Sequence, residues 1–224
     1  MTTYKALRKN PSAAQVDARI LAALRDIPVA ALSDNMHRNI GTTGLQPYHR
    51  PGAKTMAGTA VTARSRGGDN LTYLRALEFC RPGDVLVIDG GGDLNNAAVG
   101  GILSFYAASI GVVGVVIDGA IRDVAEIRER DFPVYARGVT HRGPYKDGPG
   151  EINVPVCVGG MVVHPGDILV GDQDGLLAIP QEGVEPLIEL ARAHLLKEEQ
   201  TLQAMREGRW DRSFIDALEA RCAN

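Results

Sequence analysis

The spacing of apolar residues switches between two periods along the chain, and this switching predicts an α/β fold. Short β-branched runs predict buried strands at residues 57–63, 85–88, 112–117 and 133–136. Apolar residues three or four positions apart predict helices at 12–25, 71–79, 124–130, 182–206 and 211–220, the first of them capped by Ser12. Strands that alternate with helices favour a βαβ-type core with right-handed crossovers.

Glycines interrupt this pattern in the middle of the chain. Residues 89–93 (Asp-Gly-Gly-Gly-Asp) predict a loop after the 85–88 strand, and residues 94–108 then have helical spacing. Gly100 and Gly101 lie inside that spacing, where each costs about 1 kcal/mol relative to Ala. We therefore expect the helix to begin near Ile102, with Gly100 and Gly101 as its entry.

The second half of the chain is richer in turns. Residues 138–150 are polar and rich in Gly and Pro, which predicts a long surface loop of the kind that often carries function. Residues 154–180 are short apolar runs broken by Gly-containing turns, a pattern typical of hairpins. The fold class is therefore α/β with mixed sheets and a C-terminal helical tail. With no abrupt change of composition, we predict one domain over residues 1–224.

Composition narrows the classes of function. Apolar residues make up 45% and charged residues 23% of the 224, which is typical of a globular protein. The net charge is −3 and Lys and Arg are scattered, so we expect no nucleic acid partner. No apolar run is long enough to span a membrane, and we expect a soluble, cytoplasmic protein. Cys80, Cys157 and Cys222 are far apart and odd in number, which predicts reduced structural thiols.

The clearest candidate chemistry follows the strand at 112–117. That strand delivers Asp118, Arg122 and Asp123 to the edge where open α/β sheets bind ligands. The guanidinium fork of Arg suits a carboxylate, and the carboxylate of Asp suits Mg²⁺ or Mn²⁺. The alternative is an ordinary helix start, where the helix dipole favours Asp. The spacing alone leaves both interpretations open.

Other polar motifs are less specific. The entry Gly100-Gly101-Ile102-Leu103 offers backbone N–H groups to an anion, although close helix packing would also explain its glycines. The glycines at 90–92 do not match GxGxxG, and no GK[ST] follows, so nucleotide binding is unsupported. Asp172-Gln-Asp-Gly175 lacks the spacing of an EF-hand and indicates a turn. His141 indicates a solvated loop side chain.

Four segments together resemble a known family. They are Gly83-Asp-Val-Leu-Val-Ile-Asp-Gly-Gly-Gly92, Gly114 to Asp123, Gly148-Pro-Gly-Glu-Ile-Asn-Val-Pro155 and His164-Pro-Gly-Asp-Ile-Leu-Val-Gly-Asp172. The chain resembles the regulator-of-RNase-E-activity-A-like proteins and 4-hydroxy-4-methyl-2-oxoglutarate aldolases over about residues 30–206. The Asp-Gly-x-x-Arg-Asp stretch at residues 118–123 is the most specific part of the likeness.

The resemblance implies a swivelling β/β/α domain, assembled as a homotrimer or a dimer of trimers with active sites between subunits. It implies that Arg122 binds a 2-oxo acid, that Asp123 ligates Mg²⁺ or Mn²⁺ largely through waters, and that the loop of Gly100, Gly101, Ile102 and Leu103 binds the pyruvoyl part. It also implies that a glutamate of the C-terminal helix, Glu198 or Glu199, reaches the metal site of the next subunit.

The chemistry expected of such a site needs no Schiff-base lysine. Cleaving a 4-hydroxy-2-oxo acid or decarboxylating oxaloacetate leaves pyruvate enolate, whose charge a metal on the ketone and carboxylate oxygens stabilises. Aldol cleavage also needs a base for the 4-hydroxyl proton. Aldolases of the resembled family often carry an acid where Gly101 stands here, so Asp93, Glu198 or Glu199 would have to compensate. Decarboxylation needs no base to begin.

Two functions follow as hypotheses. The first is a metal-dependent lyase that yields pyruvate from 4-hydroxy-2-oxo acids, from oxaloacetate, or from both. The alternative is a non-catalytic protein that binds and regulates an RNA-degrading endonuclease, which the missing acid at Gly101 favours and the presence of Arg122 and Asp123 opposes.

Overall fold

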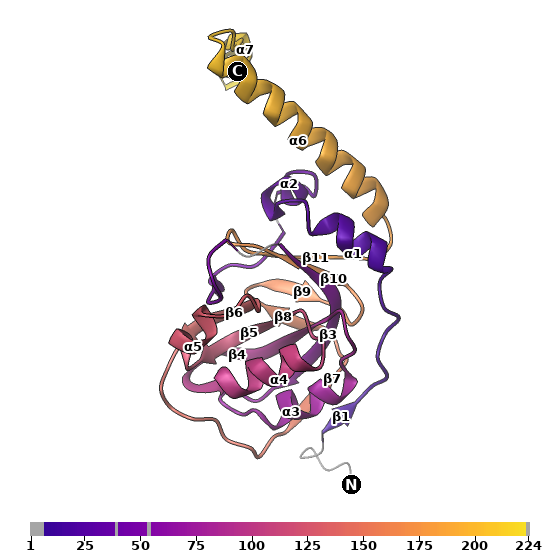
Figure 1. Cartoon of the computed structure of the whole chain (residues 1–224), viewed down its shortest axis with the longest axis vertical. Helices are drawn as coiled ribbons and strands as arrows, with labels where there is room; N and C mark the ends of the chain where they lie inside the picture. The colour runs from indigo at the N-terminus through magenta and orange to yellow at the C-terminus, as the bar shows by residue number, and fades with distance from the viewer. Residues whose placement is uncertain (1–6, 39, 53–54, 223–224) are drawn as a thin grey trace.

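The computed structural model describes residues 7–38, 40–52 and 55–222, and a mixed sheet forms its centre (Figure 1). Four parallel strands make the middle of the sheet, in the spatial order β3 (Met56–Ser65), β4 (Asp84–Val99), β5 (Gly114–Ile121) and β6 (Val134–Val139). Antiparallel strands extend it: β7 (Gly150–Ile152) and β10 (Ile168–Gly171) pair with β3, and β2 (Gln46–Pro47) pairs with β6. The outermost pairings are those of β1 (Arg8–Lys9) with β7 and of β11 (Leu176–Ile179) with β10.

The helices form two groups. One group covers a face of the sheet and comprises α3 (Leu71–Ala76), which continues as a 3₁₀ turn (Leu77–Phe79), α4 (Gly101–Ser109) and α5 (Val124–Arg128). The other group lies above β10 and β11 in Figure 1 and comprises α1 (Ala18–Leu24), α2 (Val29–Asp34) and the start of α6 (Val184–Arg206). The rest of α6 projects away from the sheet and leads to α7 (Ser213–Cys222).

The central strands are apolar where both of their faces are buried, as at residues 85–88 of β4 and 114–117 of β5. In β4, Leu86 and Ile88 pack in the cluster under the helices, whereas Val85 and Val87 point to the other face. That second face is covered by the hairpin of β8 (Val156–Val158) and β9 (Met161–Val163). Alternate side chains of one strand thus pack into two separate cores. The fold therefore has three layers: the helices, the central sheet and the β8–β9 hairpin. The predicted α/β class with a helical tail is confirmed.

The predicted loop at residues 89–93 is wrong, because β4 continues through these glycines to Val99. Gly91 and Gly92 have φ values of 65° and 72°, which a glycine adopts without strain. The pairing of β4 with β5 shifts register after Asp89, after Asp93 and after Ala97, as expected of β-bulges. The strand therefore bends at its glycines instead of ending there. The helix α4, expected to begin near Ile102, begins one residue earlier at Gly101, with Gly100 as its N-cap.

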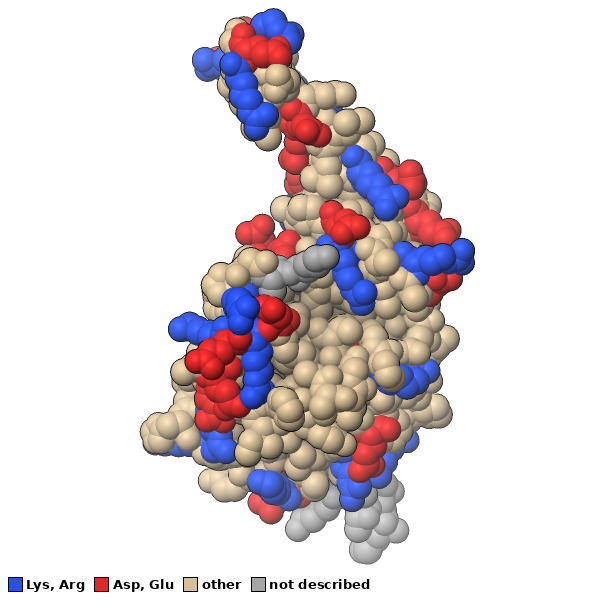
Figure 2. Space-filling model, viewed as in Figure 1, with Lys and Arg blue, Asp and Glu red and all other residues tan. Residues whose placement is uncertain are grey.

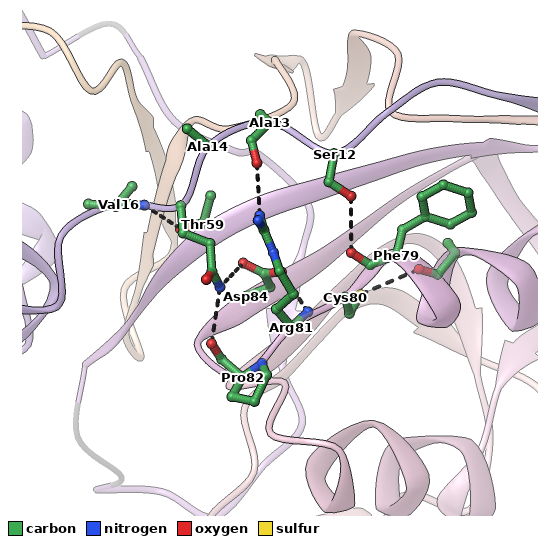
Figure 3. A network of polar contacts seen from close by, with 12 residues as sticks. Ser12, Ala13, Ala14, Val16, Thr59, Phe79, Cys80, Arg81, Pro82 and Asp84 are labelled. Atoms are coloured by element: carbon green, nitrogen blue, oxygen red, sulfur yellow. Dashed lines mark hydrogen bonds and ion pairs between the residues drawn. The ribbon is translucent and has the colours of Figure 1, made fainter.

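The first helix was predicted six residues too long at its start. Asp17 caps α1 through the Arg19 N–H (2.8 Å), and Ser12 is not the cap. Instead the Ser12 hydroxyl donates to the Phe79 carbonyl (3.2 Å), and Arg81 donates to the Ala13 carbonyl (2.8 Å; Figure 3). Residues 12–16 are extended because their backbone groups bond to the body of the protein instead of to each other.

The cysteines are free, as predicted, but their environments differ. Burial raises the pKa of the Cys80 thiol to about 12, which suits an inert structural residue. Cys157 was predicted to be a structural thiol, but it is exposed. The reason is the period of two in β8, in which Val156 and Val158 point inward and Cys157 points out.

Candidate functional site

The site lies where β4 and β5 end side by side. Val99 and Ile121 are paired at the ends of the two strands, and the Arg122 N–H donates to the Val99 carbonyl (3.0 Å). Gly100 follows β4 and Arg122 follows β5, so the two residues lie next to each other. Helices α4 and α5 both begin at this point, so two helix starts meet at the carboxyl edge of the parallel strands.

Asp123 does not act as an ordinary helix cap. It precedes α5 with a left-handed backbone (φ 58°) and makes no side-chain bond to its own helix. Its Oδ2 instead accepts a hydrogen bond from the Gly101 N–H (3.0 Å), the first amide of α4. This contact argues against the simpler interpretation, in which Asp123 only starts a helix. The carboxylate is 42% exposed, and its second oxygen has no partner among the described residues.

Gly100 lets these side chains lie against the start of α4. A Cβ at Gly100 would collide with the Asp123 carboxylate and would stand 3.1 Å from Arg122 Cγ. The guanidinium of Arg122 is also close to Asp123 Oδ2 (3.7 Å) and passes Gly143, where a Cβ would stand 3.2 Å from Nη1. Both glycines are needed for space, and neither has a left-handed backbone.

The first turn of α4 has free donors. Ser104 N–H bonds back to the Gly100 carbonyl (3.1 Å), and Gly101 N–H is used by Asp123. Within the described part of the chain, no acceptor is found for the N–H groups of Ile102 and Leu103. Free amides at a helix start attract an anion, so the predicted anion loop has the required donors.

A cavity of about 180 Å³ joins these groups. Its walls combine apolar side chains with a few polar ones, the usual composition of a small-molecule site. The lining residues are Asn70, Leu74, Ala97, Ala98, Val99, Gly100, Ile102, Leu103, Arg122, Asp123, Pro144 and Lys146. Larger grooves lie along α6, but none of them is lined by Arg122, Asp123 or the start of α4. The small cavity is therefore the better candidate site.

Sequence reasoning missed two polar residues of this cavity. Asn70 is 4% exposed, and its Oδ1 is buried without a hydrogen-bond partner in the described structure. Lys146 comes from the 140–149 loop, which Asp69 ties to the start of α3 by accepting from the N–H groups of Asp147 (2.6 Å) and Gly148 (2.9 Å). The prediction of a functional loop at 138–150 was the one signal that pointed to Lys146.

Glu198 and Glu199 do not join Asp123 within one chain. Both lie on α6, which Figure 1 shows leaving the body on the side away from α4 and α5. Glu198 pairs with His194 of its own helix (3.3 Å). Their expected contact with a neighbouring subunit therefore stays a prediction.

Asp93, the other suggested replacement for an acid at Gly101, is engaged elsewhere. Burial raises its pKa, but hydrogen bonds from Asn95 (2.8 Å) and Asn96 (3.2 Å) outweigh this and lower the pKa overall. Asp93 does not line the cavity.

Asp118, the third predicted residue of this stretch, is structural. It is 6% exposed and pairs with Arg137 through two bonds (2.5 and 3.1 Å). Burial raises the pKa of its carboxyl, yet the bonds from Arg137 and from Gly159 N–H lower the pKa overall. Its place inside β5 points it to the β8–β9 side of the sheet, away from the cavity.

The donor set fits a hydrated divalent cation better than a fully caged one. Asp123 is the single acidic side chain of the cavity lining, and the described residues contain no group of three His, Cys, Asp or Glu that could hold a metal ion. Mg²⁺ and Mn²⁺ prefer oxygen ligands and commonly keep several waters. One carboxylate with an unbonded oxygen at an open cavity fits that behaviour.

Charged side chains of both signs are present on the surface. Figure 2 shows Lys and Arg interspersed with Asp and Glu on the face drawn, in line with the net charge of −3. No helix among the described residues is long and apolar enough to span a membrane.

Comparison with known proteins gives a consistent result. The family model RraA-like, described as Aldolase/RraA, matches residues 29–178. A protein of Halalkalibacterium halodurans, provisionally named 4-hydroxy-4-methyl-2-oxoglutarate aldolase, is 37% identical to this chain over 180 residues. The matched region covers 80% of this chain and 84% of that protein. The 4-hydroxy-4-methyl-2-oxoglutarate aldolase of Thermus thermophilus is 42% identical over 113 residues, 50% of this chain and 69% of its own.

Solved structures agree on the fold. The Thermus RNA-processing inhibitor RraA superposes with a TM-score of 0.62 and 36% identity, covering 68% of this chain and 92% of its own. The relatives thus include proteins named as aldolases and a protein named as an inhibitor of RNA processing.

Proposed function

The chain belongs to the RraA-like family, which includes the proteins named as 4-hydroxy-4-methyl-2-oxoglutarate aldolases, and on this basis we propose that it is a divalent-metal-dependent lyase that releases pyruvate from 2-oxo acids. One observation carries the proposal: Arg122, Asp123 and the free amides of Ile102 and Leu103 converge on one cavity. A carboxylate-binding cation, a metal-binding carboxylate and an anion-binding helix start are the groups that a 2-oxo acid requires.

Each residue of the site has a separate role in binding the substrate or the metal. Arg122 offers its fork to the substrate carboxylate, and the N–H groups of Ile102 and Leu103 donate hydrogen bonds to the pyruvoyl oxygens. Asp123 would hold Mg²⁺ or Mn²⁺, and the bound cation would stabilise negative charge on the 2-oxo oxygen. The hydrogen bond from Gly101 fixes the Asp123 carboxylate in advance, so no reorganisation is needed during the reaction.

Lys146 and Asn70 extend the site beyond the pyruvoyl group. Lys146 adds a second cation to the cavity lining, which suits a carboxylate, and the buried Asn70 Oδ1, which has no partner in the described structure, can accept a hydrogen bond from a substrate hydroxyl. These groups suit a substrate with a second carboxylate, as 4-hydroxy-4-methyl-2-oxoglutarate and oxaloacetate both have.

An assembly of several copies fits the surface next to the site. Ile102, Phe105 and Tyr106 project from α4 with exposed fractions of 81%, 61% and 50%. Exposed apolar residues on one short helix mark a contact surface. We propose a homotrimer or dimer of trimers in which a neighbouring copy covers α4 and brings Glu198 or Glu199 to the metal.

The test is pyruvate release from 4-hydroxy-4-methyl-2-oxoglutarate and from oxaloacetate, each with Mg²⁺, with Mn²⁺ and with EDTA. We expect turnover that the metals restore and EDTA abolishes. A folded, oligomeric protein without metal-dependent turnover of either substrate would contradict the proposal.

The second candidate is a regulator that binds an RNA-degrading endonuclease. The exposed apolar side chains of α6 and α7, among them Leu196, Leu202 and Phe214, favour it because they offer a protein contact surface. A pull-down that recovers such a nuclease equally well with the wild type and with Asp123→Asn would support this function.

A further inference from the structure

Aldol cleavage needs a base, and the cavity lining contains one acidic side chain, Asp123. If Asp123 holds the metal, a second carboxylate must accept the proton of the 4-hydroxyl group. The structure places such a carboxylate at the start of α4, on a residue outside every sequence motif discussed above. It is Glu126, in the first turn of α5.

Glu126 fills the space that a side chain at position 101 would occupy. A Cβ built on Gly101 would stand 2.6 Å from Cδ and 2.9 Å from Oε1 of Glu126. Gly101 lies between Gly100 and Ile102, which both line the cavity. The carboxylate over Gly101 is not part of the cavity lining but lies beside a residue whose two chain neighbours are, and the Glu126 side chain is 49% exposed and open to water.

Arg130 holds Glu126 in this position. One end of its guanidinium pairs with Glu126, and the other donates to the Gly101 carbonyl (3.3 Å). The same guanidinium lies 5.0 Å over the ring of Phe105, on the next turn of α4. In many helices a Glu at this third position turns back to the cap residue, but here the carboxylate reaches across to another helix.

Asp123 and Glu126 thus contact Gly101 from two sides. Asp123 accepts from its N–H, and Glu126 covers its Cα. The first turn of α5 supplies one carboxylate suited to a metal and a second that is free of the metal. The missing side chain at Gly101 is what gives the second carboxylate room.

We propose that Glu126 is the proton acceptor for aldol cleavage in this chain, an inference that rests on the proposed lyase function. The carboxylate takes the proton of the C4 hydroxyl, directly or through one water. The O–H pair becomes the new C4=O bond, the C3–C4 bond breaks, and its pair becomes the pyruvate enolate. The protonated Glu126 then returns the proton to C3, which yields pyruvate and the second oxo acid.

The experiment compares two substrates in Glu126→Gln. Aldol cleavage of 4-hydroxy-4-methyl-2-oxoglutarate should fall at least about 100-fold, the usual contribution of a general base. Decarboxylation of oxaloacetate should stay within about twofold, because it starts without proton removal. Glu129→Gln, on the exposed side of the same turn, is the matched control and should leave both rates unchanged.

A second variant tests position. In Gly101→Asp/Glu126→Ala the acid moves from α5 to α4 into the same space, and aldol cleavage should recover at least about tenfold over Glu126→Ala alone. A merely structural role for Glu126 would not give this rescue.

Each other result counts against the inference. If Glu126→Gln lowers both rates equally, or neither, Glu126 is not the proton acceptor although the lyase function stands. A wild type that only decarboxylates would also overturn the inference alone. A wild type inactive on both substrates would overturn the proposed function and this inference with it.

Discussion

Asp123 Oδ2 accepts a hydrogen bond from Gly101 N–H at 3.0 Å, and this contact joins the starts of α4 and α5. Two helices that follow different strands are thereby held in one arrangement around the cavity. The contact also leaves the next two amides of α4 free for a ligand. The carboxylate proposed to hold a metal and the amides proposed to bind an anion are consequently positioned by each other.

Replacing Asp123 by Asn should remove the metal. The amide keeps the shape and tolerates the left-handed backbone, but it loses the charge that a divalent cation requires. We expect Mn²⁺ affinity to fall at least about tenfold by calorimetric titration. Asp131→Asn is the control, because its carboxylate is 72% exposed and only pairs with Arg50 on the surface. Unchanged Mn²⁺ binding in Asp123→Asn would refute the role.

Replacing Arg122 by Lys should weaken substrate binding. Lysine keeps the charge and loses the planar fork, so one of two hydrogen bonds to a carboxylate disappears. We expect KM to rise about tenfold to hundredfold, the effect of a bond between charged groups. Arg128→Lys, on the exposed side of α5, is the control. Steady-state kinetics that leave KM unchanged would exclude Arg122 from the binding site.

Gly100→Ala should displace both functional side chains at once. The added Cβ collides with the Asp123 carboxylate and crowds Arg122, so a misplacement of about 1 Å can cost about 100-fold in turnover. Gly52→Ala, where nothing lies within 4 Å but φ is +79°, controls for the backbone strain of replacing a glycine far from the site. Full activity of Gly100→Ala would mean that the close approach is irrelevant to catalysis.

Thr59→Val should reduce stability without touching the site. Thr59 is 2% exposed, and its hydroxyl accepts the Val16 N–H (3.0 Å), one of the bonds that hold residues 12–16 to the sheet. Valine has the same shape but leaves that amide unpaired, which costs about 1–3 kcal/mol. Urea unfolding measures the change, and Thr201→Val on exposed α6 serves as the control. Equal midpoints in the two variants would show that the bond contributes nothing.

His49 should make stability fall in mild acid. Burial lowers its pKa, against a smaller raising effect of the Val134 carbonyl, so the folded protein binds a proton less readily than the unfolded chain. Its contribution is therefore constant above the unfolded pKa of about 6.5, and stability is lost as pH falls below that value toward the lowered folded pKa. His49→Gln should flatten the unfolding free energy between about pH 7 and pH 5. An unchanged pH profile in this variant would assign the effect to other groups.

The strands and helices that pack on both sides were predictable from sequence because burial imposes a regular pattern. The apolar run around Leu86 and the helical spacing of α6 are local signals, and both matched the structure. The continuation of β4 was not predictable in the same way. It depends on pairing with β5 through bulges, which is a contact between distant residues.

Only some residues of the candidate site could be predicted from the sequence. Arg122 and Asp123 follow a buried strand directly, and the glycines at 100 and 101 interrupt a helical pattern, so each gave a local signal. Glu126 and Asn70 gave none, because their significance arises from the meeting of separate segments. Glu126 in particular is an ordinary surface residue of α5 until Gly101 is placed beside it.

The left-handed backbone at Asp123 limits which residues can replace it during evolution. Asn and Gly are the other residues that adopt φ near 58° easily, and the codons of Asp and Asn differ by a single base. A chain of this fold could therefore exchange the proposed metal ligand for an amide in one mutational step, without backbone strain at that position. Catalysis and fold are separable at this residue, and a lineage of binders could descend from enzymes through it.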